Sequence, residues 1–148
     1  MSVAVRGSDG IYGPLWHHAD ELAQFVYRLT WKFTESDPAL AQRMRSAALS
    51  AATSVVEACR LSGSLRARRP LRTADTALSE LGYYLYFARR IGLIPEHDLR
   101  RAGILEEEVS RYLDPLLNGD SPTHPRPGPL LNGDGPDRRV PHPDPVRT

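Results

Sequence analysis

The sequence predicts an all-α protein: an up-down-up-down four-helix bundle followed by a disordered, proline-rich tail. Residues 71–94 place apolar or small side chains at alternating steps of three and four, the spacing of a helix packed against other helices. Start and stop signals divide residues 16–118 into four helical segments with short connections. Eight of the thirteen prolines fall in residues 119–148. This segment has almost no aromatic or β-branched residues, so it cannot bury enough apolar surface to offset the entropy of ordering.

The first two helices are predicted at 16–33 and 38–61, after an irregular lead over residues 1–15 that is rich in glycine. In 16–33, one apolar stripe, acids near the start and cations near the end suit an amphipathic helix and its dipole. Ser36-Asp37-Pro38 predicts the second start, with Asp37 as N-cap and Pro38 at the first helical position. Small side chains over 46–54 let neighbouring helices approach closely, so this helix is expected to be central.

The third and fourth helices are predicted at 70–91 and 96–117. Gly92 ends the third helix and Pro95 opens the fourth, which stops at Asn118-Gly119. The third could begin earlier, near Leu65. The acidic run Glu106–Glu108 in the fourth helix is expected to be a solvated face rather than a metal site.

The composition of the chain limits the kinds of protein that it can be. A chain of 148 residues, 41% hydrophobic and 25% charged, suits one soluble domain. The net charge of +1 hides an uneven layout: residues 37–94 carry nine arginines against four acids, and 95–118 carry three against six. Cys59 is the only cysteine and is expected to be buried. Without a signal peptide or a run of ~20 apolar residues, we expect a cytoplasmic protein that does not associate with membranes.

No catalytic constellation stands out. His17 and His18 are adjacent, so on a helix they point in different directions and cannot share a metal ion. The sequence lacks a Glu-x-x-His motif, an HExxH motif and a glycine-rich phosphate loop. We therefore expect a protein that is not an enzyme, with no catalytic residues, no metal site and no cofactor.

Arginines gather where antiparallel helices bring their ends together, which favours binding to nucleic-acid phosphates. One end of the bundle would collect cations near 28–45 and 89–101, where pairing with nearby acids is an equally good interpretation. The other end would collect those near 60–72, where acids are scarcer. The predicted phosphate-binding residues are Arg43, Arg45, Arg66, Arg68, Arg69, Arg72, Arg89 and Arg90.

Aromatic residues in the third helix point around more than one face. Tyr83, Tyr86 and Phe87 lie away from the apolar seam, so they are predicted to cover an interface between subunits. Stacking of nucleic-acid bases on these rings is the alternative.

These helical patterns resemble a known family. The accessory variability determinant (Avd) proteins of diversity-generating retroelements are similar in the third and fourth helices, in Ala74-Asp75-x-Ala77-Leu78-x-x-Leu81, Leu85, Ala88, Ile91-Gly92-Leu93-Ile94 and Glu107-x-x-x-Arg111-Tyr112-Leu113. The wider four-helix-bundle family, which includes proteins encoded by 23S ribosomal RNA intervening sequences, is similar in Val26-Tyr27-x-Leu29-Thr30, Arg43-x-Arg45-x-Ala47-Ala48 and Ser54–Glu57. The resemblance covers about residues 18–117 and excludes the tail.

The resemblance implies a homopentamer with a basic surface that binds structured RNA or DNA and associates with a reverse transcriptase and its template RNA. Avd proteins often have arginine where this chain has Gly82 and Tyr86, and a glycine-tryptophan ending where it has Asp114-Pro115. These departures would move the nucleic-acid contact to 66–72 and 89–90. The alternative function is a homo-oligomeric interaction scaffold that touches no nucleic acid.

Overall fold

The computed structural model describes residues 10–119, and within them the predicted four-helix bundle is confirmed. Its elements are α1 (Tyr12–Trp31), α2 (Pro38–Arg60), the 3₁₀ turn η1 (Leu65–Ala67), α3 (Arg68–Arg90) and α4 (Glu96–Asn118). Most of the predicted irregular lead and nearly all of the predicted disordered tail lie outside the described residues.

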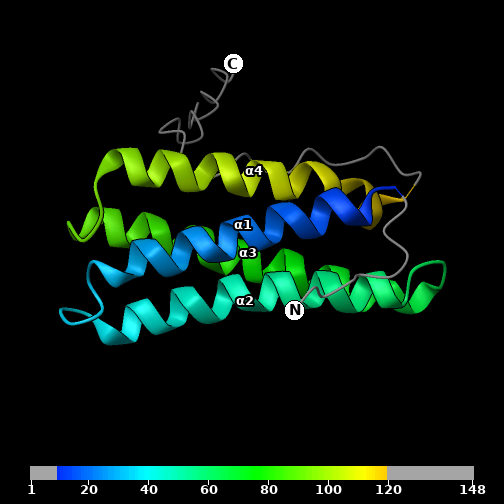
Figure 1. The fold of residues 1–148 in the computed structure, drawn as a ribbon, viewed down its shortest axis with the longest axis horizontal. Coiled ribbons are helices and arrows are strands. Elements are labelled where there is room, and N and C mark those ends of the chain that lie inside the picture. The colour runs from blue at the N-terminus through cyan, green and yellow to red at the C-terminus, as the bar shows by residue number, and fades with distance from the viewer. Residues whose placement is uncertain (1–9, 120–148) are drawn as a thin grey trace, which may run out of the picture.

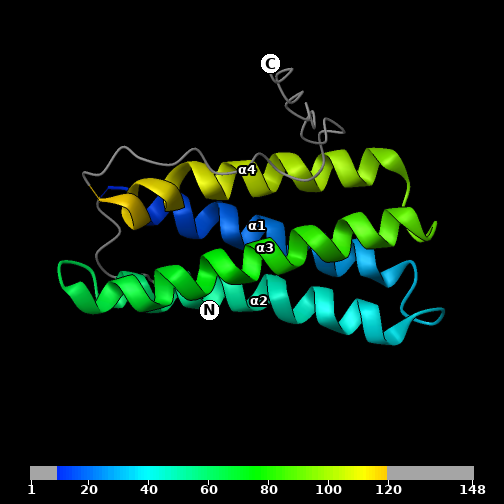
Figure 2. The ribbon, with the colours of Figure 1, turned by 180° about the vertical axis from the view of Figure 1, so that it is seen from behind.

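The helices run up, down, up and down (Figure 1). The α1–α2 and α3–α4 connections lie at one end of the bundle, and the α2–α3 connection lies at the other, beside the start of α1 and the end of α4 (Figures 1 and 2). Each helix packs against two neighbours: α1 and α3 both contact α2 and α4. The most extensive packing joins α2 to α3. The small side chains of α2 thus pack closely against one neighbour, but α2 has two neighbours like the other three helices and is not central to the bundle.

Local signals set most of the helix boundaries. The Asp37 carboxylate accepts a hydrogen bond from the Leu40 backbone N–H at 2.9 Å, so the predicted N-cap of α2 is confirmed. Gly92 and Gly119 have φ angles of +81° and +51° just beyond α3 and α4, a conformation that favours glycine. The start of α1 lies four residues earlier than predicted, because Pro14 falls in the first turn, where a helix does not need its N–H.

The core follows the predicted seam. All six seam residues of α3 are buried: Leu71, Ala74, Leu78, Leu81, Leu85 and Ala88. They meet a buried face of α2 of which half the residues are alanine, and small side chains there allow the close α2–α3 approach. Cys59 is buried, as expected. Near the end of α4 the fully buried residue is Leu113, while Tyr112 and Leu116 are half-buried.

The expectation of a solvated face at Glu106–Glu108 is wrong for Glu106. Burial raises the pKa of its carboxyl to about 8, and its Oε1 atom is buried without a hydrogen-bond partner among the described residues. Glu106 is buried because its carboxylate packs over Gly82 of α3. A Cβ atom added to Gly82 would lie only 3.4 Å from Glu106 Oε2. Glu107 is exposed, as expected for a solvated face.

No helix in the part of the chain that the structure describes is long and apolar enough to cross a membrane.

Candidate nucleic-acid interface

An open groove of about 570 Å³ runs between α2 and the start of α3. These two helices lie side by side in Figures 1 and 2. Three of the predicted arginines, Arg68, Arg69 and Arg72, line the groove together with the hydroxyl-bearing Ser50 and Thr76. The groove therefore offers guanidinium and hydroxyl groups, both of which donate hydrogen bonds to phosphate oxygens. Glu80 is the acidic residue in its lining.

The arginines of this groove stand at the unfavourable end of a helix. Arg66 lies in η1, Arg68 and Arg69 open α3, and Arg72 follows one turn later. The first turn of α3 contains no acidic residue, and its N-cap, Ala67, has no side-chain hydrogen bond. Cations next to the positive end of a helix dipole cost stability, on the order of 0.3–1 kcal/mol each at an exposed position. A bound anion would interact favourably with both the dipole and the arginines.

Among the four described helices, α3 differs by opening on arginines: the start of α1 also lacks a side-chain cap and acidic residues, but its first turn has no cation. Glu96 and Asp98 complement the dipole in the first turn of α4, and the Asp37 carboxylate caps α2. At the start of α3, a bound phosphate would therefore relieve the unfavourable interaction between the arginines and the helix dipole.

Most of the cluster is available to a ligand. Arg66, Arg69 and Arg72 are exposed, and within residues 10–119 their guanidinium groups have no ion-pair partner. Arg68 is different, because its Nη2 donates a hydrogen bond to the Leu117 carbonyl oxygen at 3.3 Å. That contact satisfies a carbonyl in the last turn of α4 and places the guanidinium between the two helices.

Arg45 is taken up by packing between α1 and α2. Its Nε donates to the Thr30 hydroxyl at 2.8 Å, and its guanidinium carbon lies 4.6 Å from the centroid of the Tyr27 ring and 5.9 Å from that of Trp31. The Thr30 hydroxyl is buried and in turn donates to the Val26 carbonyl at 2.8 Å. Arg45 thus joins two helices, a role the sequence interpretation did not assign to it.

The remaining predicted arginines lie at the opposite end of the bundle, with the α1–α2 and α3–α4 connections. Arg89 Nε donates to Glu96 Oε2 at 3.0 Å, and Arg90 Nη1 donates to the Tyr86 hydroxyl at 3.0 Å. Arg43 is exposed and has no such partner in the described segment. The structure therefore divides the eight arginines between two ends, and internal pairing dominates at this one.

An exposed apolar stripe follows α3 toward its end. Tyr83, Phe87 and Ile91 are four residues apart, so they share one face, and they are 52%, 40% and 49% exposed. The rings of Tyr83 and Phe87 stack with centroids 6.2 Å apart. Tyr86 is half-buried and contacts Arg90, so it does not belong to the stripe. Sequence reasoning missed Ile91, although continuing the four-residue step from Phe87 would have found it.

Comparison with models of protein families places the four helices in a known family. The model of a family described as 23S rRNA-intervening sequence protein matches residues 14–114. The matched span covers the four helices nearly from end to end and includes the cationic groove and the whole exposed stripe. No curated protein matches the chain at a significant level.

Proposed function

The chain belongs to the 23S rRNA-intervening sequence protein family, and from that premise we propose that it is a non-catalytic, oligomeric protein that binds structured RNA or DNA. The observation that carries the proposal is the cluster of Arg66, Arg68, Arg69 and Arg72 around the positive end of α3. Uncompensated cations at a helix start, next to an open groove, suit the phosphate backbone of a nucleic acid.

The finer proposal is that the protein is an accessory to a reverse transcriptase and its template RNA in a diversity-generating retroelement. Its support is the resemblance of residues 74–94 and 107–113 to Avd proteins. A reverse-transcriptase gene beside the coding sequence, with template and variable repeats, is the genomic context that agrees with it. Unrelated enzymes in that place would favour the alternative, a homo-oligomeric scaffold without a nucleic-acid role, which the exposed stripe of α3 supports.

The first test is the affinity of the purified protein for a structured RNA and a matched duplex DNA across a salt series. With three to four phosphates neutralised by the groove, the logarithm of the affinity should fall with the logarithm of salt concentration with a slope of roughly −2 to −4. A flat salt dependence, or negligible binding at low salt, would show that the arginines serve another partner and would leave the scaffold as the function.

We expect the exposed stripe of α3 to form the interface between subunits. The resemblance to Avd proteins implies that the oligomer is a pentamer. Replacing Tyr83 and Phe87 together with glutamate buries two charges in any contact made by this face, so we expect the dissociation constant for self-association to rise at least tenfold, roughly 1.4 kcal/mol or more. Sedimentation velocity over a range of protein concentrations would measure it.

Trp31→Glu is the control for the interface test, because it places a glutamate at an exposed aromatic residue of α1. If only the Trp31 variant dissociates, the interface lies on α1. If neither variant changes the sedimentation coefficient, the stripe of α3 does not hold subunits together.

A further inference from the structure

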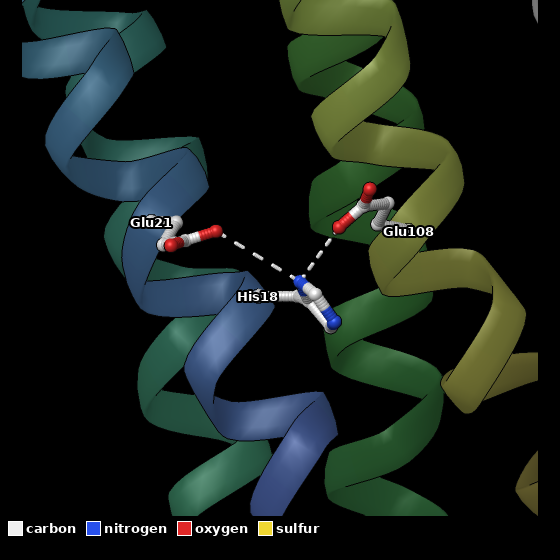
Figure 3. Close-up of side chains that lie close together, drawn as sticks. All are labelled: His18, Glu21 and Glu108. Carbon is white, nitrogen blue, oxygen red and sulfur yellow. Dashed lines mark ion pairs between the residues drawn. The ribbon is translucent and has the colours of Figure 1, made fainter.

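Three potential metal ligands converge between α1 and α4 (Figure 3). His18 and Glu21 come from α1, and Glu108 comes from α4. The His18 Nδ1 atom lies 2.9 Å from Glu108 Oε2 and 3.9 Å from Glu21 Oε2. One donor atom from each of the three residues lies within 4.8 Å of the others.

The convergence follows from helix geometry. His18 and Glu21 are three residues apart, so their side chains share one face of α1. The antiparallel neighbour α4 presents Glu108 to that face. In the chain, α2 and α3 lie between these two helices (Figure 1). The sequence interpretation considered the pair His17 and His18 for a metal site and missed this set, because Glu108 is ninety residues away in the chain.

The imidazole nitrogen at the centre of the cluster has a carboxylate neighbour but no hydrogen bond among the described residues. His18 Nδ1 is buried, and among the described residues no hydrogen bond reaches it. The Glu108 oxygen is close enough, at 2.9 Å, but is not aligned for a hydrogen bond. A buried polar atom left without a hydrogen bond is unusual in folded proteins, and a bound water or ion is one way in which such an atom is satisfied. A cation between the three side chains would satisfy the nitrogen and both carboxylates.

Neighbouring residues hold two of these ligands in place. The His18 ring stacks on Tyr112 of α4, with centroids 5.3 Å apart and planes 19° from parallel. His17 Nε2 lies 3.2 Å from Glu21 Oε1, which leaves the other oxygen, Oε2, facing His18. Contacts that orient the ligands in this way are typical of metal sites.

We propose that His18, Glu21 and Glu108 form a binding site for a divalent transition metal ion, with Zn²⁺ as the best fit. One imidazole nitrogen and two carboxylate oxygens suit this borderline ion, which binds both donor types at ~2.0–2.2 Å. Tetrahedral geometry at that bond length separates ligand atoms by roughly 3.4 Å, between the two distances from His18 Nδ1. A water molecule would complete the coordination, since the side chains of His18, Glu21 and Glu108 are 20%, 46% and 34% exposed and solvent borders the cluster.

A bound ion would connect the first helix of the bundle directly to the last. Because the folded chain brings the three ligands together, an ion that binds only the folded state would also stabilise it. The effect is separate from the cationic groove, which α2 and α3 form.

The test is Zn²⁺ binding by the full-length protein after treatment with a chelator, measured by isothermal titration calorimetry. The comparison is between Glu108→Gln and Glu107→Gln, which remove the same charge from adjacent residues, one a proposed ligand and one exposed to solvent. We expect one Zn²⁺ per chain in the wild type and in the Glu107 variant, with a dissociation constant at least about tenfold higher for the Glu108 and His18→Gln variants.

Melting temperature provides a second readout. Zn²⁺ should raise it for the wild type and Glu107→Gln and leave it nearly unchanged for Glu108→Gln. Circular dichroism checks the fold; should His18→Gln not fold, Glu108→Gln decides. Equal Zn²⁺ binding by Glu108→Gln and Glu107→Gln would overturn the proposal and leave His18 and Glu108 as an ion pair. Absence of binding by the wild type would overturn it as well.

Discussion

Reversing Arg66, Arg69 and Arg72 together to glutamate is expected to weaken binding to structured RNA by at least about a hundredfold at 0.1 M salt. Each arginine loses a phosphate contact and is replaced by a charge that repels the backbone. The salt slope should become shallower by roughly 2–3, because three fewer counterions are released. Arg68 is left unchanged in this variant because its hydrogen bond to the Leu117 carbonyl also joins α3 to α4.

The same variant separates a binding defect from a folding defect. Glutamate near the start of α3 complements the helix dipole that arginine opposes. The variant should therefore melt at the same temperature as the wild type or slightly higher, while its affinity falls. A loss of affinity together with a loss of helicity would mean that the arginines support the fold instead.

Arg100→Glu, Arg101→Glu and Arg111→Glu combined form the matched control. These three arginines are exposed on α4, so the control changes the net charge by the same amount away from the groove. We expect it to lower RNA affinity by less than about tenfold, through the general field of the protein alone. Equal losses in the two variants would show that net charge, and no particular groove, governs binding.

The fold could be predicted because its signals are local. The three-and-four spacing from Leu71 to Ala88, the Asp37 cap and the glycines that follow α3 and α4 act over a few residues, and each is confirmed. The cationic cluster near 66–72 is local in the same sense, since its members follow one another along the chain. Their cost to the helix dipole became evident only with the start of α3 placed at Arg68.

Features that depend on how two helices meet were not predictable in the same way. Arg45 was assigned to phosphates, yet its guanidinium meets Thr30, which lies fifteen residues earlier on another helix. The register of α2 against α1 decides that contact, and the sequence pattern of either helix alone does not contain it.

The acidic run of α4 shows the same limit. Successive residues of a helix point about 100° apart, so three adjacent glutamates meet three environments. Glu106 lies against Gly82 of α3, Glu107 faces solvent and Glu108 approaches His18 of α1. Interpreting the run as one solvated face is correct for the middle residue and overlooks the packing of α4 between two neighbours.

Glu106 gives the second large prediction: Glu106→Gln should stabilise the protein at alkaline pH and have little effect at acidic pH. Burial first, and then the nearby charge of Glu107, raise the pKa of this carboxyl from 4.5 to about 8. Between these values the folded state holds a proton that the unfolded state has lost, so stability falls as the pH rises from about 4.5 to about 8. Glutamine has nearly the same shape and carries no charge at any pH, so it removes this loss.

We expect the free energy of unfolding of Glu106→Gln to exceed that of the wild type by about 2 kcal/mol at pH 9, and by less than about 0.5 kcal/mol at pH 4.5. At about 1.4 kcal/mol per pKa unit, the full pKa shift corresponds to a larger difference in the free energy of unfolding. The expected difference is smaller because Glu106 is not fully shielded from solvent, which screens its charge. Urea denaturation from pH 4.5 to 9 with a chelator present measures the difference. Glu107→Gln, at an exposed residue, should show a much smaller gain, because it removes only the lesser cause of the raised pKa of Glu106. If the free energies of unfolding of wild type and Glu106→Gln run parallel from pH 4.5 to 9, the carboxylate is not buried and unpaired. If the two converge only at acidic pH, the glutamate over Gly82 destabilises the bundle whenever it is ionised.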